Sequence, residues 1–150
     1  MDASSNRNQH VITDDQFRAL RFNLLTTCSW INDNMRKFLL PHNITPKQYS
    51  ILRILNDRYP ESLSIQEVRE MLADKMSDAS RLVDRLEKKG WLDKFPSDQD
   101  RRSNRARITD GGRGLLNAIN RDRQLLDATI SERLTDADVD SLNDLLERLR

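Results

Sequence analysis

One stretch, Met76–Thr109, constrains the fold more than any other because it joins an amphipathic helix to a basic hairpin. Apolar residues at helical spacing define one buried face, made of Ala79, Leu82, Val83 and Leu86. We expect Ser77 to cap the start of this helix and Gly90, in the left-handed conformation, to end it. Two short strands, Trp91–Phe95 and Ser103–Ile108, are expected next, and the second alternates arginines with apolar residues. A helix followed by a basic hairpin is suited to holding nucleic acid.

The charge distribution supports this interpretation. Residues 75–107 contain ten Lys and Arg against six Asp and Glu, a net charge of +4, whereas the whole chain carries +1. Such asymmetry places an anion-attracting patch on a nearly neutral molecule. An ordinary solvated surface is the alternative, because 33% of the chain is charged. The position of the cations on a helix and a hairpin tip favours nucleic acid.

Composition narrows the class of protein. A chain of 150 residues with 5% aromatics, four Gly and four Pro is typical of one mostly helical domain. One cysteine excludes an internal disulfide, and no Cys/His cluster has the spacing of a metal site. The N-terminal segment lacks the apolar core of a signal peptide, and no run of apolar residues is as long as a membrane helix. We therefore expect a cytoplasmic protein with no cofactor, no metal and no membrane association.

The remaining segments also have clear helix signals. A stripe of apolar residues spaced three and four apart predicts a helix from Asp14 to about Leu40, ended by Pro41, and its length suggests a partner. Thr45–Gln48 and Ser64–Glu67 are capping boxes that begin two shorter helices. Together with the Met76–Thr109 stretch they predict a winged helix-turn-helix.

Two helices are expected after the hairpin, from Thr109 to about Leu134 and from Thr135 to the end. The expected fold is mostly α with a small β-hairpin wing, in which the long terminal helices form a dimerisation lobe. We divide the chain into a disordered segment 1–12, a dimerisation helix 13–42, a DNA-binding region 43–109 and dimerisation helices 110–150. These segments make one structural domain overall.

The order of these motifs resembles the MarR family of bacterial transcriptional regulators. The resemblance covers roughly residues 15–150 and rests on Thr45–Gln48, Arg81–Gly90, Asp98–Arg102 and Ile108–Thr109. One feature departs from the family's usual pattern. In the first helix of the helix-turn-helix a small alanine commonly follows a leucine, whereas this chain has Val68-Arg69. The resemblance implies a homodimer that binds a pseudo-palindromic DNA operator, often as a repressor. In many members a small aromatic ligand releases the DNA, and others respond to cysteine oxidation.

The first turns of a recognition helix normally meet base edges in the major groove. We therefore assign base reading to Ser77, Ser80 and Arg81. Arg85 and Lys88 lie further along, where they contact phosphate or pair with Asp84.

The hairpin tip contains Asp100, Arg101 and Arg102. The resemblance implies that Arg102 enters the minor groove, where narrow grooves favour arginine, while Asp100 braces its guanidinium. A salt-bridged turn without a ligand is the alternative. The helix beginning at Ser64, with Gln66 nearby, offers backbone N–H groups to phosphate.

Three residues have competing interpretations. Trp30 and Met35 either line an effector cavity or belong to the core or dimer interface. Cys28 either senses oxidation or packs as a small apolar residue, and its place on the apolar stripe favours packing.

Two classes of function compete with regulation. A winged helix also serves as a protein-interaction module, since fold alone does not fix function. An enzyme is disfavoured, because no nucleophile–base pair, phosphate-binding glycine loop or metal cluster is found.

Overall fold

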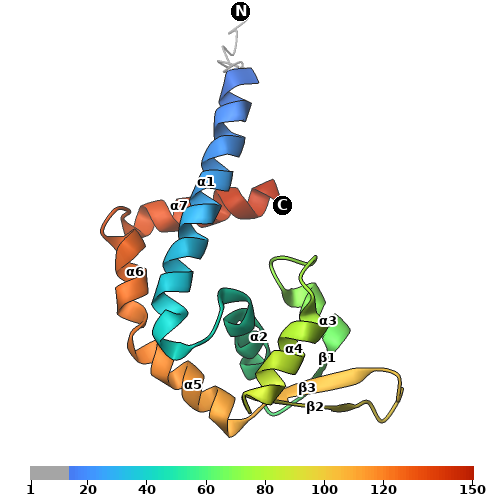
Figure 1. Cartoon of the computed structure of the whole chain (residues 1–150). Helices are drawn as coiled ribbons and strands as arrows, with labels where there is room; N and C mark the ends of the chain where they lie inside the picture. The colour runs from blue at the N-terminus through green and yellow to red at the C-terminus, as the bar shows by residue number, and fades with distance from the viewer. Residues whose placement is uncertain (1–13) are drawn as a thin grey trace, which may run out of the picture. The chain divides into compact units, whose positions relative to one another are not determined.

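A computed structural model describes residues 14–150, so the segment 1–12 that we predict to be disordered lies outside the described residues. The chain divides into two compact units, one ending at Asn34 and the other comprising Met35–Arg150. The elements (Figure 1) are α1 (Asp14–Leu39), η1 (Leu40–His42), α2 (Pro46–Asp57), β1 (Leu63–Ser64), α3 (Ile65–Met71), α4 (Ala79–Lys88), β2 (Leu92–Pro96), β3 (Asn104–Ile108), α5 (Asp110–Arg121), α6 (Arg123–Ser131) and α7 (Asp136–Leu149). The predicted fold class, mostly helical with a small hairpin wing, is confirmed. Of the helices in residues 14–150, none has the length and apolarity that crossing a bilayer requires.

Helix α1 confirms the predicted first helix to within one residue. Pro41 lies in the short 3-10 turn η1 that follows it. Much of the apolar stripe is exposed on the single chain, including Phe17, Leu20 and Ile31. Cys28 is exposed as well, so the prediction that it packs in a core is wrong for the chain by itself. The reason is that this stripe exceeds what one chain covers.

Both predicted capping boxes are confirmed. At the start of α2, the Gln48 backbone N–H donates to Thr45 Oγ1 (3.3 Å) and the Thr45 N–H donates to Gln48 Oε1 (3.2 Å). At the start of α3, the Glu67 N–H donates to Ser64 Oγ (3.1 Å) and the Ser64 N–H donates to Glu67 Oε2 (2.7 Å). Each box satisfies two backbone donors that a helix start leaves unpaired.

The strands form an antiparallel sheet in the order β1-β3-β2. Strands β2 and β3 confirm the predicted hairpin to within one residue at each end. Strand β1, which the sequence analysis missed, pairs Leu63 with Ala106. The sheet therefore joins the hairpin to the segment that leads directly into α3.

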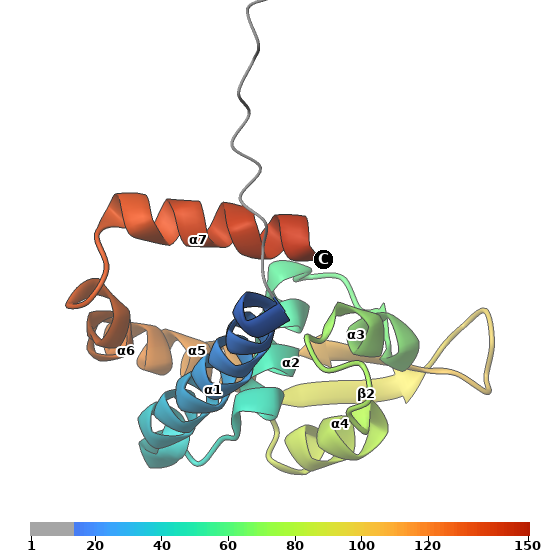
Figure 2. The same cartoon turned by 90° about the horizontal axis from the view of Figure 1, so that it is seen from above.

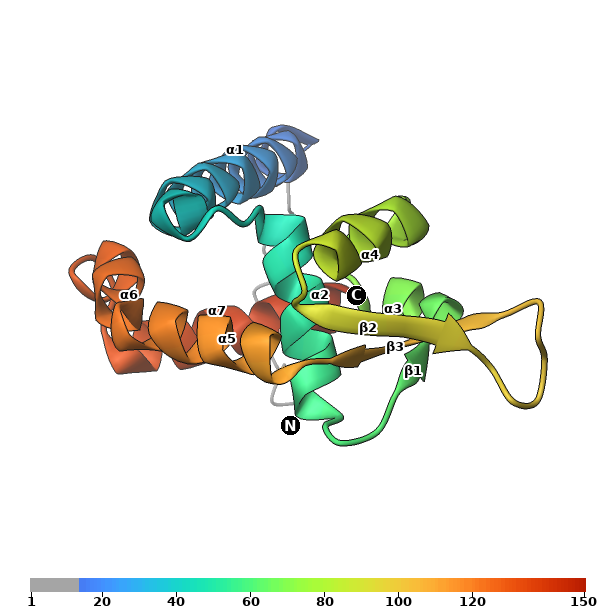
Figure 3. The ribbon, with the colours of Figure 1, turned by 60° about the horizontal axis from the view of Figure 1, so that its bottom comes forward.

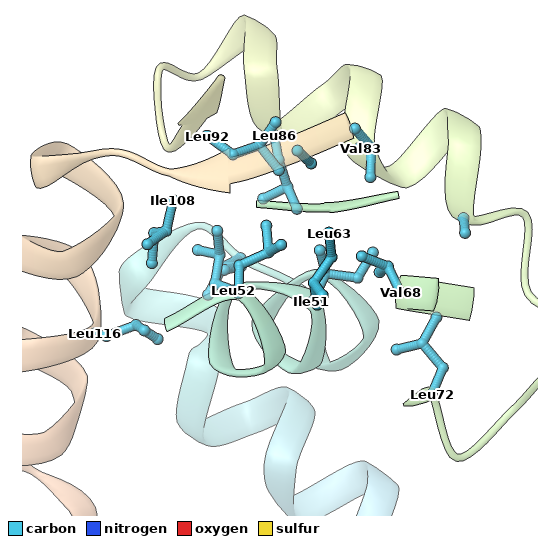
Figure 4. Packing of buried hydrophobic residues seen from close by; sticks show 14 of the residues in the cluster. Ile51, Leu52, Leu63, Val68, Leu72, Val83, Leu86, Leu92, Ile108 and Leu116 are labelled. Atoms are coloured by element: carbon cyan, nitrogen blue, oxygen red, sulfur yellow. The ribbon is translucent and has the colours of Figure 1, made fainter. Parts of the chain in front are cut away.

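The core of the unit Met35–Arg150 lies between the sheet and helices α2, α4 and α5 (Figure 4). Ile51 and Leu52 of α2 are fully buried, as are Val83 and Leu86 of α4. The helix–sheet packing is completed by a further set of buried residues, Leu63, Leu92, Ala106, Ile108, Leu116 and Ile119. Burial of the Ala79, Val83 and Leu86 face confirms the main part of the predicted apolar stripe, and Leu82 is partly buried beside it.

The long helix predicted from Thr109 to Leu134 is wrong, because the chain forms two helices, α5 and α6, that meet at Asp122. The residues around this break, 120–124, are all polar. No buried side chain therefore holds the two segments in one continuous helix. Helix α7 begins at the predicted cap, Thr135, whose Oγ1 accepts from the Asp138 N–H (3.2 Å).

Helix α5 begins in close contact with the base of the hairpin. Thr109 donates its backbone N–H to the Trp91 carbonyl (3.2 Å) and its hydroxyl to the Gly90 carbonyl (2.7 Å). A Cβ atom at Gly112 would lie 2.1 Å from the Trp91 carbonyl oxygen, so only glycine fits there. Gly90 has φ +73°, which confirms the left-handed residue predicted after α4.

Candidate nucleic-acid interface

Helix α4 begins one residue later than predicted. Its N-cap is Asp78, whose Oδ1 accepts from the Arg81 N–H (3.2 Å), and the prediction of Ser77 as the cap is wrong. Ser77 is 8% exposed, and its hydroxyl donates to Asp74 Oδ2 (3.1 Å). A side chain so buried and already paired has little surface for a base edge, and of the three predicted base-reading residues only Ser80 and Arg81 are exposed.

The outer face of α4 is cationic. Ser80, Arg81, Arg85 and Lys88 are exposed on it, opposite the buried Val83 side. The Arg81 side chain is 81% exposed and its Nε lies 3.2 Å from Asp78 Oδ2. An exposed pair of this kind is worth at most about 1 kcal/mol, so Arg81 can exchange Asp78 for another acceptor.

The hairpin extends beyond the helices of its unit and ends in the loop 97–103 (Figure 2). Asp100, Arg101 and Arg102 are all exposed in this loop. The Asp100 carboxylate accepts the backbone N–H of Arg102 (2.9 Å), and the Asp100 carbonyl accepts the N–H of Ser103 (2.9 Å). Asp100 thus shapes the turn, and within residues 14–150 it forms no ion pair with the Arg102 guanidinium, contrary to the bracing implied by the resemblance.

Helix α3 places Gln66 near the start of α4. Gln66, Arg69, Ser77 and Ser80 line one small cleft between the two helices. Gln66 donates to Glu70 Oε1 (2.7 Å) and accepts from Arg69, while the Ser64 hydroxyl caps its own helix. The structure therefore brings Gln66 and Ser80 together, and phosphate contacts at Ser64 and Gln66 stay a prediction.

An ion pair that the sequence analysis missed joins α4 to the hairpin. Lys94 Nζ of β2 lies 2.5 Å from Asp84 Oδ1 and 4.0 Å from Glu87 Oε2, both on α4. The hydrogen bond with Asp84 raises the pKa of Lys94. Figure 3 shows α4 lying alongside β2. Asp84 therefore pairs with Lys94 and not with Arg85 or Lys88, the partners considered from the sequence. The signal in the sequence was a lysine at an inward position of an alternating strand.

A cavity of about 590 Å³ opens beside the C-terminal end of α4. Its walls include the apolar residues Leu40 and Ile44 and the cations Arg85, Lys88 and Lys89. Neither Trp30 nor Met35 lines it. Trp30 is 39% exposed and Met35 packs against the core, so both residues stay predictions as effector contacts.

No group of three or more His, Cys, Asp or Glu side chains among residues 14–150 is arranged to hold a metal ion. What the site offers is a set of hydrogen-bond donors and cations on one helix face and one loop. Such groups bind phosphate oxygens and purine acceptor atoms.

This chain is similar in sequence and in fold to known proteins. The model of the MarR family matches residues 44–103. The HTH-type transcriptional regulator MhqR of Bacillus subtilis is 32% identical over 120 residues, which cover 79% of this chain and 81% of that protein. The HTH-type transcriptional repressor IacR of Pseudomonas putida is 27% identical over 97% of this chain and 87% of that protein. A crystal structure of a mutant MarR from Escherichia coli complexed with operator DNA has the same fold, with a TM-score of 0.81 and 22% identity over 90% of this chain and 96% of that one.

Proposed function

The chain belongs to the MarR family of transcriptional regulators, and from this premise we propose that it is a homodimeric, sequence-specific DNA-binding repressor. In this proposal Ser80 and Arg81 of α4 read bases in the major groove, and Arg85 and Lys88 contact phosphate. Arg102 enters the adjacent minor groove, with Arg101 beside it.

The observation that carries the proposal is that two exposed cationic elements belong to one compact unit, residues 35–150. The outer face of α4 presents Arg81, Arg85 and Lys88, and the loop 97–103 presents Arg101 and Arg102. A helix of the width of α4 fits the major groove, and arginine suits the negative potential of a narrow minor groove.

The dimer proposal is supported by exposed apolar residues on both terminal helices. Phe17, Leu20 and Ile31 are exposed on α1, and Leu142 and Leu145 are exposed on α7. Large apolar side chains exposed at helical spacing mark an interaction surface. A two-fold dimer would present two copies of α4 to a pseudo-palindromic operator, with half-sites about 34–36 Å apart.

The name of one relative supports a further part of the proposal. IacR is named a repressor, which supports repression by this chain. We also propose release by a small aromatic effector, for which Trp30 and Met35 are the candidate contacts. Because the target is chromosomal DNA, we place the protein in the cytoplasm.

The test is a salt titration of binding to fluorescent duplexes taken from intergenic DNA next to the gene, measured by anisotropy. We expect log Kd to rise steeply with log salt concentration, by about 0.9 for each phosphate contacted. Arg102→Ala should weaken binding and reduce the preference for A·T-rich flanks. Light scattering should give twice the chain mass of 17.5 kDa.

Two results would refute the proposal. A monomer in light scattering would contradict the dimer that presents two copies of α4 to the operator. A dimer that ignores duplex DNA at low salt would instead support the winged-helix protein-interaction module.

A further inference from the structure

Lys94 occupies a strand position at which an apolar residue is expected. In the register of the hairpin, Leu92 faces Ile108 and Lys94 faces Ala106. Leu92, Ala106 and Ile108 are all buried, so alternation places Lys94 on the core side of the sheet. Its side chain is 28% exposed, so most of it is covered.

The Lys94 ammonium group connects the wing to the recognition helix at two points. Asp84 and Glu87, its two partners, are three residues apart and therefore lie on the same side of α4. The contact with Asp84 is a direct hydrogen bond between charged groups, and it joins a lysine side chain that is 28% exposed to an aspartate side chain that is 47% exposed. The hydrogen bond with Asp84 raises the pKa of Lys94 above its ordinary value, which shows that the pairing favours the charged ammonium group.

This arrangement also determines which cations of α4 are available to a ligand. In the part of the chain that the structure describes, no carboxylate forms an ion pair with Arg85 or Lys88. The nearby acidic side chain Asp84 is bonded to Lys94. Lys94 lies on the core side of the hairpin, and its ammonium group is already paired with Asp84 and Glu87.

We propose that Lys94 is a positioning residue for DNA binding: it ties β2 to α4, so that the wing and the recognition helix engage neighbouring grooves together. The inference rests on the proposed function. It assigns Lys94 no contact with DNA, because its side chain is largely covered and its Nζ is bonded to Asp84. Positioning can be separated from folding, because the Asp84 side chain is 47% exposed and its carboxylate stays hydrated when Lys94 is replaced, so the loss of stability should be small.

The test compares Lys94→Met, Lys94→Arg and Asp84→Asn for duplex affinity, salt dependence and melting temperature. Lys94→Met should weaken binding about tenfold, which corresponds to about 1.4 kcal/mol, with a salt slope equal to that of the unsubstituted protein. Lys94→Arg keeps the charge and should bind within about threefold. Lys37→Met, which removes one positive charge from α1, is the matched control and should also bind within about threefold.

Asp84→Asn gives the sharpest result because it raises the net positive charge. The change in charge alone would strengthen the binding of this variant to DNA. Loss of the Lys94–Asp84 ion pair should instead weaken its binding several-fold, roughly as Lys94→Met does. The double variant Lys94→Met/Asp84→Asn should bind DNA no more weakly than Lys94→Met alone, because the two changes break the same interaction. In the Lys94→Met background, Arg102→Ala should also lose less affinity than it does alone.

Three results would overturn the inference. Tighter binding by Asp84→Asn, with a salt slope lowered by about 0.9 in Lys94→Met, would make Lys94 a direct phosphate contact. Unchanged affinity in Lys94→Met would remove its role. A fall in melting temperature that accompanies the loss of affinity in both Lys94→Met and Asp84→Asn would show that Lys94 has a purely structural role. Failure of the unsubstituted dimer to bind duplex DNA would instead refute the proposed function.

Discussion

Two glycines in the first turns of α5 should respond in opposite ways to the same substitution. A Cβ atom at Gly112 would lie 2.1 Å from the Trp91 carbonyl oxygen and 2.8 Å from Ile108 Cγ1. At Gly114 a Cβ atom would meet nothing within 4 Å. Both residues lie inside the helix, so both gain the same helix propensity on substitution by alanine.

The free energies follow from these distances. Alanine is favoured over glycine in a helix by about 1 kcal/mol, so Gly114→Ala should raise the free energy of unfolding by about 0.5–1 kcal/mol. In Gly112→Ala the new methyl must move away from the carbonyl by roughly 1 Å, and such overpacking costs about 1–3 kcal/mol. The displacement also strains the Thr109–Trp91 hydrogen bond, whose loss costs about 1 kcal/mol. Gly112→Ala should therefore be destabilising by roughly 1–3 kcal/mol.

Urea unfolding monitored by circular dichroism measures both changes, at one fixed protein concentration because dimerisation contributes to stability. The midpoints should move apart, with Gly114→Ala above the unsubstituted protein and Gly112→Ala below it. A midpoint for Gly112→Ala at or above that of the unsubstituted protein would refute the close approach of α5 to the hairpin base. A matching fall for Gly114→Ala would show that the helix itself requires glycine.

Three other predictions follow from the packing and the caps. Leu86→Ala removes a fully buried side chain and should lower the free energy of unfolding by about 2–5 kcal/mol in urea titrations, whereas a loss under 1 kcal/mol would contradict the core assignment. Asp78→Ala removes the N-cap of α4 and should be destabilising by about 0.5–2 kcal/mol, with Asp78→Asn as the control that keeps the cap. Hydrogen bonds from Ser64 lower the pKa of Glu67 below its ordinary 4.5, so this carboxylate contributes stability that is complete above pH 4.5 and is lost as the pH falls through the lowered pKa. Glu67→Gln should flatten that part of the acid unfolding profile, and an unchanged profile would contradict the role of Glu67.

Signals that act within a few residues were predicted correctly from the sequence. The capping boxes at Thr45 and Ser64 and the left-handed Gly90 are local, because each satisfies backbone groups within one turn of chain. The hairpin was predicted for the same reason, since β2 and β3 are neighbours in sequence.

The errors arose where two local solutions compete or where a distant segment decides. Ser77 and Asp78 are both good caps, and the burial of Ser77 against Asp74 leaves Asp78 in that role. Strand β1 exists only because β3 lies beside it, and no pattern within two residues predicts that. Helix α1 was placed correctly, but Cys28 was not, because one chain does not bury its whole apolar stripe.

The candidate site divides in the same way. The cationic face of α4 and the arginines of the hairpin loop were recognisable from charge and periodicity. The pairing of Lys94 with Asp84 was not, because it depends on how the strand and the helix pack against each other. The Asp100 carboxylate supports the backbone of its turn, a role that the motif alone did not distinguish from bracing a guanidinium.

The central position of β3 in the sheet has a consequence for how the wing is acquired during folding. Arg105 of β3 donates from its Nε to Ser62 Oγ (2.8 Å), a contact between residues 43 positions apart, and β1 pairs beside it. Two-stranded hairpins alone are at best marginally stable in water. An excised peptide of residues 90–110 should therefore remain unstructured, and in the intact chain the amide protons of β3 should exchange with deuterium only as slowly as the whole unit opens.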